Sequence, residues 1–238
     1  MLPPRYLLRE NVVVNLVKEL APKRFAEIGC GAGELLARLA SLGFEGVGYD
    51  LSEMVRNHAR ARLAQGNIRS IEIVDEFPEN GKFDVVLLLE VLGYLEDPHE
   101  LLRRCRDLLT PSGRLIVSYA RAGAGYDSRV VAGMNFFTRD EVTRLLLESG
   151  LKNVRQINYG YPLANALVGL NNRVYNLRLA LRKRALEVEE TAVAHTWPWL
   201  KPAALVSNRL TMKPFFWAQR FSADTNLGNG YVAFAERA

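Results

Sequence analysis

The chain has 238 residues and a net charge of +5, with 49% hydrophobic and 24% charged residues, a composition typical of one globular domain with a substantial core. Its two cysteines are too few for a disulfide framework or a cysteine-based metal site, so we expect no metal and a reducing, cytoplasmic setting. Charges interrupt the first 20 residues, which excludes a long apolar signal or membrane span there and favours a soluble protein.

Strands and helices are predicted to alternate along the first 160 residues, after an amphipathic helix from about Tyr6 to Leu20. The apolar patterns predict strands at 24–29, 45–50, 70–74, 82–91, 114–120 and 153–159, with helices at 33–43, 53–65, 97–109 and 138–150. A turn at 110–113 separates the third of these helices from the strand that follows. This alternation is typical of a doubly wound, mostly parallel α/β sheet.

The regular pattern ends at Gly160, and a last strand is predicted only at 230–237. The segment between them, 161–228, is helical or irregular and holds nine Lys and Arg against four Asp and Glu. Basic and acidic residues balance in the rest of the chain, so the whole positive excess lies in this segment. We therefore predict a core of residues 1–160 plus 229–238, with a basic, mainly helical insertion at 161–228.

The first strand leads into the glycine-rich turn AEIGCGAGELL, residues 26–36. A phosphate-binding loop would need Lys and Ser or Thr after the last glycine, where Glu34 and Leu35 stand. The dinucleotide fingerprint would need a third glycine at position 34. Carboxylates at Glu27 and Glu34 would also repel a pyrophosphate at the start of the helix. A tight turn without a ligand stays open as an alternative.

The same acidic residues suit a ligand that is cationic near the loop. S-adenosylmethionine carries an ammonium and a sulfonium group but no phosphate, so a carboxylate at the strand end attracts it while glycines allow a close approach. We therefore predict S-adenosylmethionine as the cofactor. The loop residues predicted to contact it are Glu27, Gly29, Cys30, Gly31 and Gly33.

Acidic residues that end the second and third predicted strands could supply further contacts. Asp50, about seventeen residues after the last glycine, is placed to accept both ribose hydroxyls in a bidentate hydrogen bond. It could also cap the helix that follows. Asp75 or Glu76 could accept the adenine amino group, or either side chain could simply be solvated in a loop.

Four segments in order, EIGCGAGE, GVGYDLS, KFDVVLLLEVLGYLEDP and LLTPSGRLIVS, resemble successive motifs of class I S-adenosylmethionine-dependent methyltransferases, closest in style to the small-molecule enzymes of quinone biosynthesis. The resemblance covers about residues 1–160 and the last strand. It implies a Rossmann-like sheet of seven strands whose last strand is antiparallel and inserted beside the sixth. It also implies that adenine lies near Leu51 and that the stretch from Glu90 to Tyr94 flanks the methyl group.

A hydroxyl acceptor would need a base, and an amine must arrive unprotonated. The candidate bases are Glu90, Tyr94, His99 and His195. Glu90 ends a central strand, where open α/β sheets bind ligands, and it could contact the cofactor as well. Relatives often carry a histidine at the position of Tyr94, so an acid–base role does not transfer there directly. His195 lies within the insertion and could reach a substrate.

The insertion is the main indication of the acceptor. Apolar residues from Leu167 to Leu181 follow the spacing of one helical face, and arginines occupy the other faces. Such a basic amphipathic helix suits an acceptor-side cap over an anionic or lipid-like acceptor, or peripheral contact with an anionic membrane. It could equally pack on the core with solvated charges.

The sequence therefore predicts methyl transfer from S-adenosylmethionine to the oxygen or nitrogen of a small acceptor that is anionic or lipid-like. The alternative is a non-catalytic protein on the same fold that binds an anionic partner or membrane through the insertion. Nucleic acid is a less favoured partner because the positive excess is modest. In addition, residues 90–93 match neither of the known base-methylating motifs.

Overall fold

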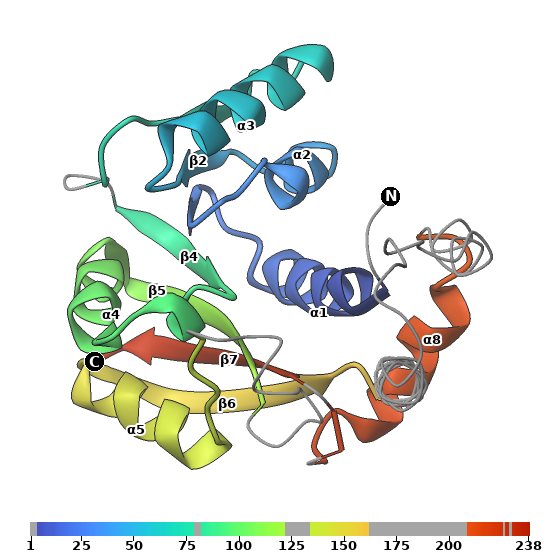
Figure 1. Cartoon of the computed structure of the whole chain (residues 1–238), viewed down its shortest axis with the longest axis vertical. Coiled ribbons are helices and arrows are strands. Elements are labelled where there is room, and N and C mark those ends of the chain that lie inside the picture. Colours follow the sequence, from blue (N-terminus) through green and yellow to red (C-terminus); the bar gives the residue numbers. More distant parts are fainter. Residues whose placement is uncertain (1–3, 79–81, 122–133, 162–208, 226, 229) are drawn as a thin grey trace, which may run out of the picture.

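The computed structural model describes residues 4–78, 82–121, 134–161, 209–225, 227–228 and 230–238. Its centre is a seven-stranded sheet in the order β3-β2-β1-β4-β5-β7-β6 (Figure 1). The last strand, β7, lies between β5 and β6 and runs antiparallel to both, while the other pairs are parallel. This confirms the predicted doubly wound sheet with an antiparallel last strand.

The strands lie close to the predicted ranges: β1 (Phe25–Ile28), β2 (Gly46–Tyr49), β3 (Ile71–Ile73), β4 (Phe83–Leu89), β5 (Leu109–Ala120), β6 (Leu151–Tyr159) and β7 (Gly230–Arg237). The helices are α1 (Pro4–Leu20), α2 (Glu34–Ala40), α3 (Glu53–Gln65), α4 (Pro98–Asp107), α5 (Arg139–Glu148) and α8 (Lys213–Ala218), with 3-10 helices η1 (Leu92–Tyr94) and η3 (Gln219–Ser222). The predicted turn at 110–113 instead belongs to an irregular start of β5, where the pairing with β4 shifts register.

Helices cover both faces of the sheet, so its central strands are buried on both sides. In β4, Val85 and Leu87 face one core with the apolar sides of α1, α2 and α3, whereas Val86 and Leu88 face a second core with α4 and α5. Figure 1 shows these two groups of helices on either side of the sheet. The continuous apolar run in β4 is thus explained by burial on both faces.

Strand order reverses at β1, which lies between β2 and β4. The chain leaves β1 through α2 toward one edge of the sheet and later returns to β4 on the other side. In an open α/β sheet, such a reversal leaves a crevice at the carboxyl ends of the strands, where ligands bind. The glycine-rich turn after β1 lies at this crevice.

Part of the predicted insertion is described. Helix α8 and η3 pack beside α1 (Figure 1), and the Gln219 side chain donates a hydrogen bond to the Leu8 carbonyl at 3.1 Å. The predicted amphipathic helix and His195 lie outside the described residues, so the division into core and insertion stays a prediction. Among the described residues, no helix has the length and apolar character needed to cross a membrane.

Candidate active site

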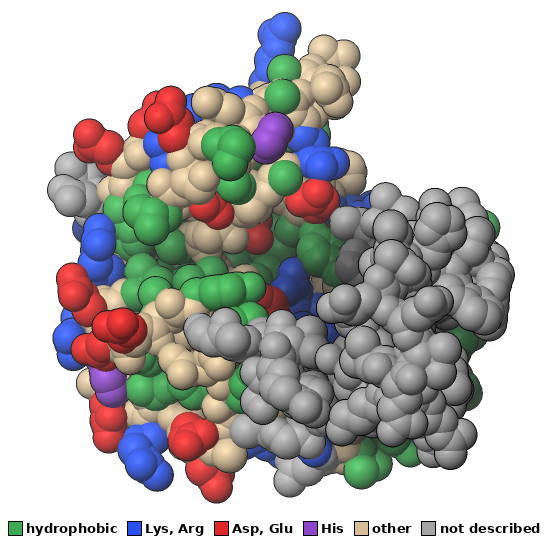
Figure 2. All heavy atoms as spheres, viewed as in Figure 1, with side chains coloured by type: hydrophobic (Ala, Val, Ile, Leu, Met, Phe, Trp, Pro, Cys, Tyr) green, Lys and Arg blue, Asp and Glu red, His purple; other side chains and the backbone are tan. Residues whose placement is uncertain are grey.

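A cavity of about 760 Å³ opens at the carboxyl ends of β1, β2 and β4. The register brings these ends level, because Ile28 of β1 lies opposite both Tyr49 of β2 and Leu88 of β4. Residues that follow directly, including Gly29 and Asp50, line the cavity. In Figure 2 it is visible as a hollow between the part of the surface that carries α3 and the part that carries α4.

The glycine-rich turn requires the absence of side chains. Gly29, Gly31 and Gly33 all have positive φ, at 76°, 55° and 77°, a region that L side chains rarely adopt. A Cβ on Gly29 would also lie 2.5 Å from a methyl carbon of Val91, which lines the same cavity. Gly29 thus allows the turn to pack directly against Val91, whereas Gly31 leaves open space, because a Cβ there would meet no atom within 4 Å.

Arg62 of α3 binds the end of this turn that leads into α2. Its Nε donates to the Ala32 carbonyl and its Nη2 to Glu34 Oε1, both at 2.7 Å. The charge of Glu34 is thus paired within the chain. Glu34 therefore repels an anionic ligand less strongly than the sequence suggests.

The Asp50 carboxylate is held in place by two backbone donors. Its Oδ2 accepts from the Gly31 amide at 3.0 Å and its Oδ1 accepts from the Ser52 amide at 3.1 Å. The N-cap of α3 is Ser52, whose side chain accepts from the Val55 amide. Asp50 is therefore free of the capping role considered as an alternative, and its remaining lone pairs are available on the cavity wall.

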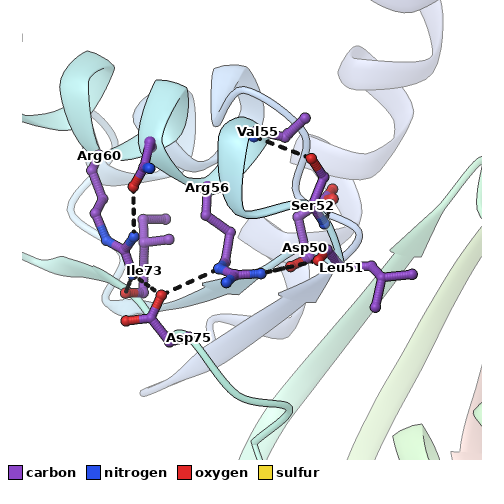
Figure 3. A network of polar contacts seen from close by, with 9 residues as sticks. Asp50, Leu51, Ser52, Val55, Arg56, Arg60, Ile73 and Asp75 are labelled. Carbon is purple, nitrogen blue, oxygen red and sulfur yellow. Dashed lines mark hydrogen bonds and ion pairs between the residues drawn. The ribbon is translucent and has the colours of Figure 1, made fainter.

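Next to Asp50, Arg56 joins the ends of β2 and β3 (Figure 3). Its Nη1 donates to the carbonyls of Asp50 and Leu51 at 2.7 and 3.1 Å, and its Nε contacts Asp75 Oδ1 at 3.3 Å. Arg60 contacts the same Asp75 oxygen at 2.7 Å. These hydrogen bonds from the nearly buried Arg56 hold the backbone in place at Leu51, which lines the cavity.

Beyond this network, Phe77 lines the cavity where the sequence predicts Asp75 or Glu76 to act. Both acidic side chains are exposed, and the two arginines hold the pKa of Asp75 below its ordinary value. Phe77 packs edge-on against Tyr49 at 5.6 Å and beneath the Arg104 guanidinium at 3.8 Å. The contacts proposed for Asp75 and Glu76 stay predictions, and the aromatic wall is an addition to them.

Glu27, which is 4% exposed, is a buried carboxyl beside the loop, and its Oε2 has no hydrogen-bond partner. Burial raises its pKa to about 8; Arg9 opposes this rise, while Glu34 and Asp50 add to it. Glu27 is therefore mostly protonated at neutral pH even though Arg9 is nearby. An unsatisfied buried oxygen of this kind indicates a ligand that brings its own donor or positive charge.

Glu90 follows β4 and ties several elements together. Its carboxylate accepts hydrogen bonds from Tyr159 Oη at 2.7 Å, Ser118 Oγ at 3.2 Å and Arg5 Nη2 at 3.2 Å. Arg9 Nη1 lies 3.6 Å from the same carboxylate. The backbone of Glu90 has a φ of 60°, a conformation that is costly for a residue with a side chain and is maintained here by these contacts.

These partners decide the charge of Glu90. Burial alone would raise its pKa, but Arg5, Arg9 and the two hydroxyl donors outweigh burial and hold the pKa below its ordinary value. Glu90 therefore stays ionised at neutral pH, and its oxygens are already occupied. Such a carboxylate is suited to holding α1 at the cavity rather than to removing a proton.

The other candidate residues are less engaged. Tyr94, in η1, lines the cavity and is 69% exposed. Cys30 is buried, which raises the pKa of its thiol to about 12 and leaves it protonated. His99 of α4 lies 3.7 Å from Glu148, and His195 is not among the described residues.

Several site residues were not predicted from the sequence, among them Arg9, Arg56 and Phe77. Each lies within a pattern that also fits a helix surface or a loop, and the partners that give it a role are far away in sequence. The one available signal for Arg9 is its spacing from Arg5, because residues four apart lie on the same side of a helix.

The fold and this site define a class I methyltransferase. The family model described as a methyltransferase domain matches residues 4–156, more than half of the chain, so the chain belongs to this family. It is 28% identical over 166 residues to the ubiquinone biosynthesis O-methyltransferase of Acinetobacter baylyi, covering 61% of this chain and 70% of that protein.

Solved structures show the same fold. A methyltransferase of Thermotoga maritima, described as a possible histamine N-methyltransferase, aligns with a TM-score of 0.59 at 17% identity, over 98% of this chain and 90% of that one. Magnesium protoporphyrin IX methyltransferase of Synechocystis, solved with S-adenosylhomocysteine, aligns with a TM-score of 0.56 at 20% identity, over 64% of this chain and 76% of that one.

The cofactor is S-adenosylmethionine, as the family implies, and the residues present fit it. The unpartnered oxygen of Glu27 suits the ammonium group, and the open space beside Gly31, where a Cβ would meet no atom within 4 Å, suits an extended chain against the backbone. The open lone pairs of Asp50 suit a ribose. Nothing in this set of residues requires a phosphate or a metal ion, and the described residues include no cluster of metal-ligating side chains.

Proposed function

We propose that this protein transfers the methyl group of S-adenosylmethionine to an oxygen or nitrogen of a small acceptor. The observation that carries the proposal is the buried carboxyl of Glu27, whose Oε2 has no hydrogen-bond partner and which lies two residues before Gly29 of the cavity wall. When bound, the cofactor supplies a methyl group on a sulfonium centre. The residues of this chain bind and align that group and exclude water from it.

Opposite charges would hold the amino-acid end of the cofactor. Glu27 would accept from the ammonium and give up its proton as the cation arrives. Arg9 lines the cavity and its side chain is 15% exposed, so its guanidinium can contact the carboxylate of the cofactor's amino-acid end. Asp50 would accept from the ribose hydroxyls, and Leu51 and Phe77 would contact adenine.

Glu90 would act as a positioning residue. Its carboxylate joins Arg5 and Arg9 of α1 to Tyr159 of β6, so α1 is held over the carboxyl ends of the central strands. Tyr94 is placed to contact the acceptor, because it lines the cavity next to Glu90 and most of its side chain is exposed. His195 stays a candidate acid–base residue on sequence grounds alone.

The acceptor would be small and either anionic or lipid-like. Aromatic and aliphatic side chains form the cavity wall from Leu89 to Leu95, which suits an apolar or flat molecule. The positive excess of the insertion favours a negative group on the same acceptor. The non-catalytic alternative is not favoured, because four residues expected to contact the donor line one cavity: Gly29, Asp50, Leu51 and Glu90.

Calorimetry with S-adenosylhomocysteine tests the donor site directly, and an acceptor screen with labelled S-adenosylmethionine tests transfer. The unmodified protein should bind the product, and Asp50→Ala should bind it more weakly. Asp84→Ala is the matched control, because the Asp84 carboxylate also accepts from backbone amides, at Lys23 and Arg24, but lies at the opposite end of β4. Failure of the unmodified protein to bind the product would refute the proposal.

A further inference from the structure

Helix α8 and η3 expose an apolar and basic side away from the core. The inner side is fixed by Met212, which is 3% exposed, and by the buried Gln219 that bonds to α1. On the outer side, Trp217 is 63% and Phe221 is 73% exposed. Their rings contact each other edge-to-face at 4.7 Å. Two large aromatic side chains thus lie together in solvent, although the helix has a core to pack on.

Basic residues flank this aromatic pair. Lys213 and Arg220 are both exposed and lie four residues before and three residues after Trp217, which places all three on one side of the helical turn. We refer to Lys213, Trp217, Arg220 and Phe221 as the α8 surface. The spacing makes this surface both aromatic and cationic.

A groove of about 380 Å³ between α1, α2 and α8 continues the α8 surface. Arg38, Arg209, Lys213 and Arg220 contribute its basic lining. Among the described lining residues the one acid is Glu10, and Arg209 binds it through two hydrogen bonds of 2.6 and 3.0 Å. The other three basic side chains therefore leave the groove positively charged.

We propose that the α8 surface docks the protein on an anionic phospholipid membrane. The rings of Trp217 and Phe221 would lie at the boundary of headgroups and acyl chains, where aromatic residues are favoured. The basic groove would take the phosphate groups of the lipids, which attract each nearby Lys or Arg. The alternation of aromatic and basic side chains over one turn matches a lipid interface better than a protein partner, whose interface core would be depleted of lysine.

Docking extends the proposed function, because it identifies the surface at which a lipid-like acceptor would reach the protein. Docking itself does not require methyl transfer to occur. Helix α8 packs on α1, and α1 supplies Arg9 to the donor cavity (Figure 1). The membrane contact and the cavity therefore share one rigid helix. An enzyme held in this way could take an acceptor from the bilayer without first extracting it into water.

Co-sedimentation with vesicles tests the proposal. The unmodified protein should bind vesicles that contain phosphatidylglycerol and should not bind vesicles of phosphatidylcholine alone, and added salt should weaken the binding. Lys213→Glu with Arg220→Glu should lower the partition coefficient at least about thirty-fold, since each basic residue near an anionic surface contributes about fivefold. Trp217→Ser with Phe221→Ser should also lower it while keeping the charge.

The matched control is Lys18→Glu with Lys152→Glu, which changes the net charge equally at exposed positions outside the α8 surface. Its binding should stay within a few-fold of the unmodified protein, and an equal loss in both charge-reversed variants would overturn the proposal. Equal binding to both kinds of vesicle would also overturn it. A third outcome would overturn the proposal: the unmodified protein does not bind vesicles, and light scattering shows that the α8 variants differ from it in oligomeric state. That outcome would assign the α8 surface to self-association.

Calorimetry with S-adenosylhomocysteine separates this proposal from the proposed function. Every variant should keep the product affinity of the unmodified protein, because none of these residues lines the donor cavity. A protein that binds anionic vesicles but not the product would refute the proposed function alone. One that binds the product but no vesicle would refute the docking alone.

Discussion

Replacing Glu27 with glutamine should stabilise the ligand-free protein while weakening its binding of S-adenosylhomocysteine. The substitution keeps the size of a side chain that is 4% exposed and removes its ability to ionise. The two effects have one origin, because a buried carboxyl without a hydrogen-bond partner is costly to ionise until a cation lies beside it.

The size of the stability effect follows from the pKa of Glu27, which burial raises from 4.5 to about 8. Below the unfolded pKa both states bind the proton, so Glu27 has no effect there. As the pH rises toward 8 the unfolded chain loses the proton and the folded chain keeps it, so stability is lost over this window. At about 1.4 kcal/mol per unit, the loss amounts to up to about 5 kcal/mol.

Urea unfolding of both proteins at about pH 5 and about pH 8.5 measures this loss, because the glutamine of the Glu27→Gln variant cannot titrate and contributes no slope of its own. The difference in unfolding free energy between variant and unmodified protein should grow with pH in favour of the variant. At about pH 8.5, where Glu27 is mostly ionised before the ligand binds, product affinity should fall by roughly 10- to 150-fold, since a charge-assisted hydrogen bond is worth about 1.5–3 kcal/mol. Parallel stability profiles, or an unchanged affinity, would refute the reasoning.

Three further substitutions address the rest of the site. Arg56→Met should cost about 1–3 kcal/mol in urea unfolding and weaken product binding in calorimetry, because it leaves two backbone carbonyls unsatisfied, whereas Arg60→Met, at a half-buried position with one backbone carbonyl partner, should change both by less. Gly29→Ala should abolish product binding in the same assay, since its methyl group would lie 2.5 Å from a valine side chain at a φ of 76°; normal affinity would contradict the close approach. Tyr159→Phe should destabilise the protein by about 1–2 kcal/mol and raise the pKa of Glu90. The stability that ionised Glu90 contributes is lost as the pH falls through its folded pKa, so acid unfolding of this variant should begin at a higher pH; an unchanged acid profile would contradict the assigned contact.

The fold was largely predictable from the sequence because its signals are local. The apolar run of β4 is long enough to be distinguished from the alternation of a half-buried strand, and Ser52 and Thr138 begin their helices with the side-chain bonds expected of them. The exception is the start of β5, where the Pro and Gly of residues 110–113 predict a turn. There the chain keeps strand pairing through a register shift, a tertiary effect that no local pattern records.

The site was predictable only where it is built from strand ends. Gly29 and Asp50 follow β1 and β2 directly, so the parallel register brings them together. Arg56 lies on a helix whose charged surface indicates exposure, and only its contacts with the ends of two strands reveal that it is buried. Glu90 illustrates the same limit, because its role depends on partners contributed by α1 and β6.

The site favours a cationic ligand for a different reason from the one that the sequence suggests. Glu34 is paired with Arg62, and Glu27 is mostly protonated, so the loop by itself carries little of the negative charge that the sequence suggests. At pH 7, ionising Glu27 costs about 1 kcal/mol for a pKa of about 8, which one charge-assisted hydrogen bond offsets. A cation can make that exchange and an anion cannot. We therefore propose that selectivity for the ammonium of the cofactor arises as the ligand binds, from a carboxyl that is mostly protonated at neutral pH until the cation is present.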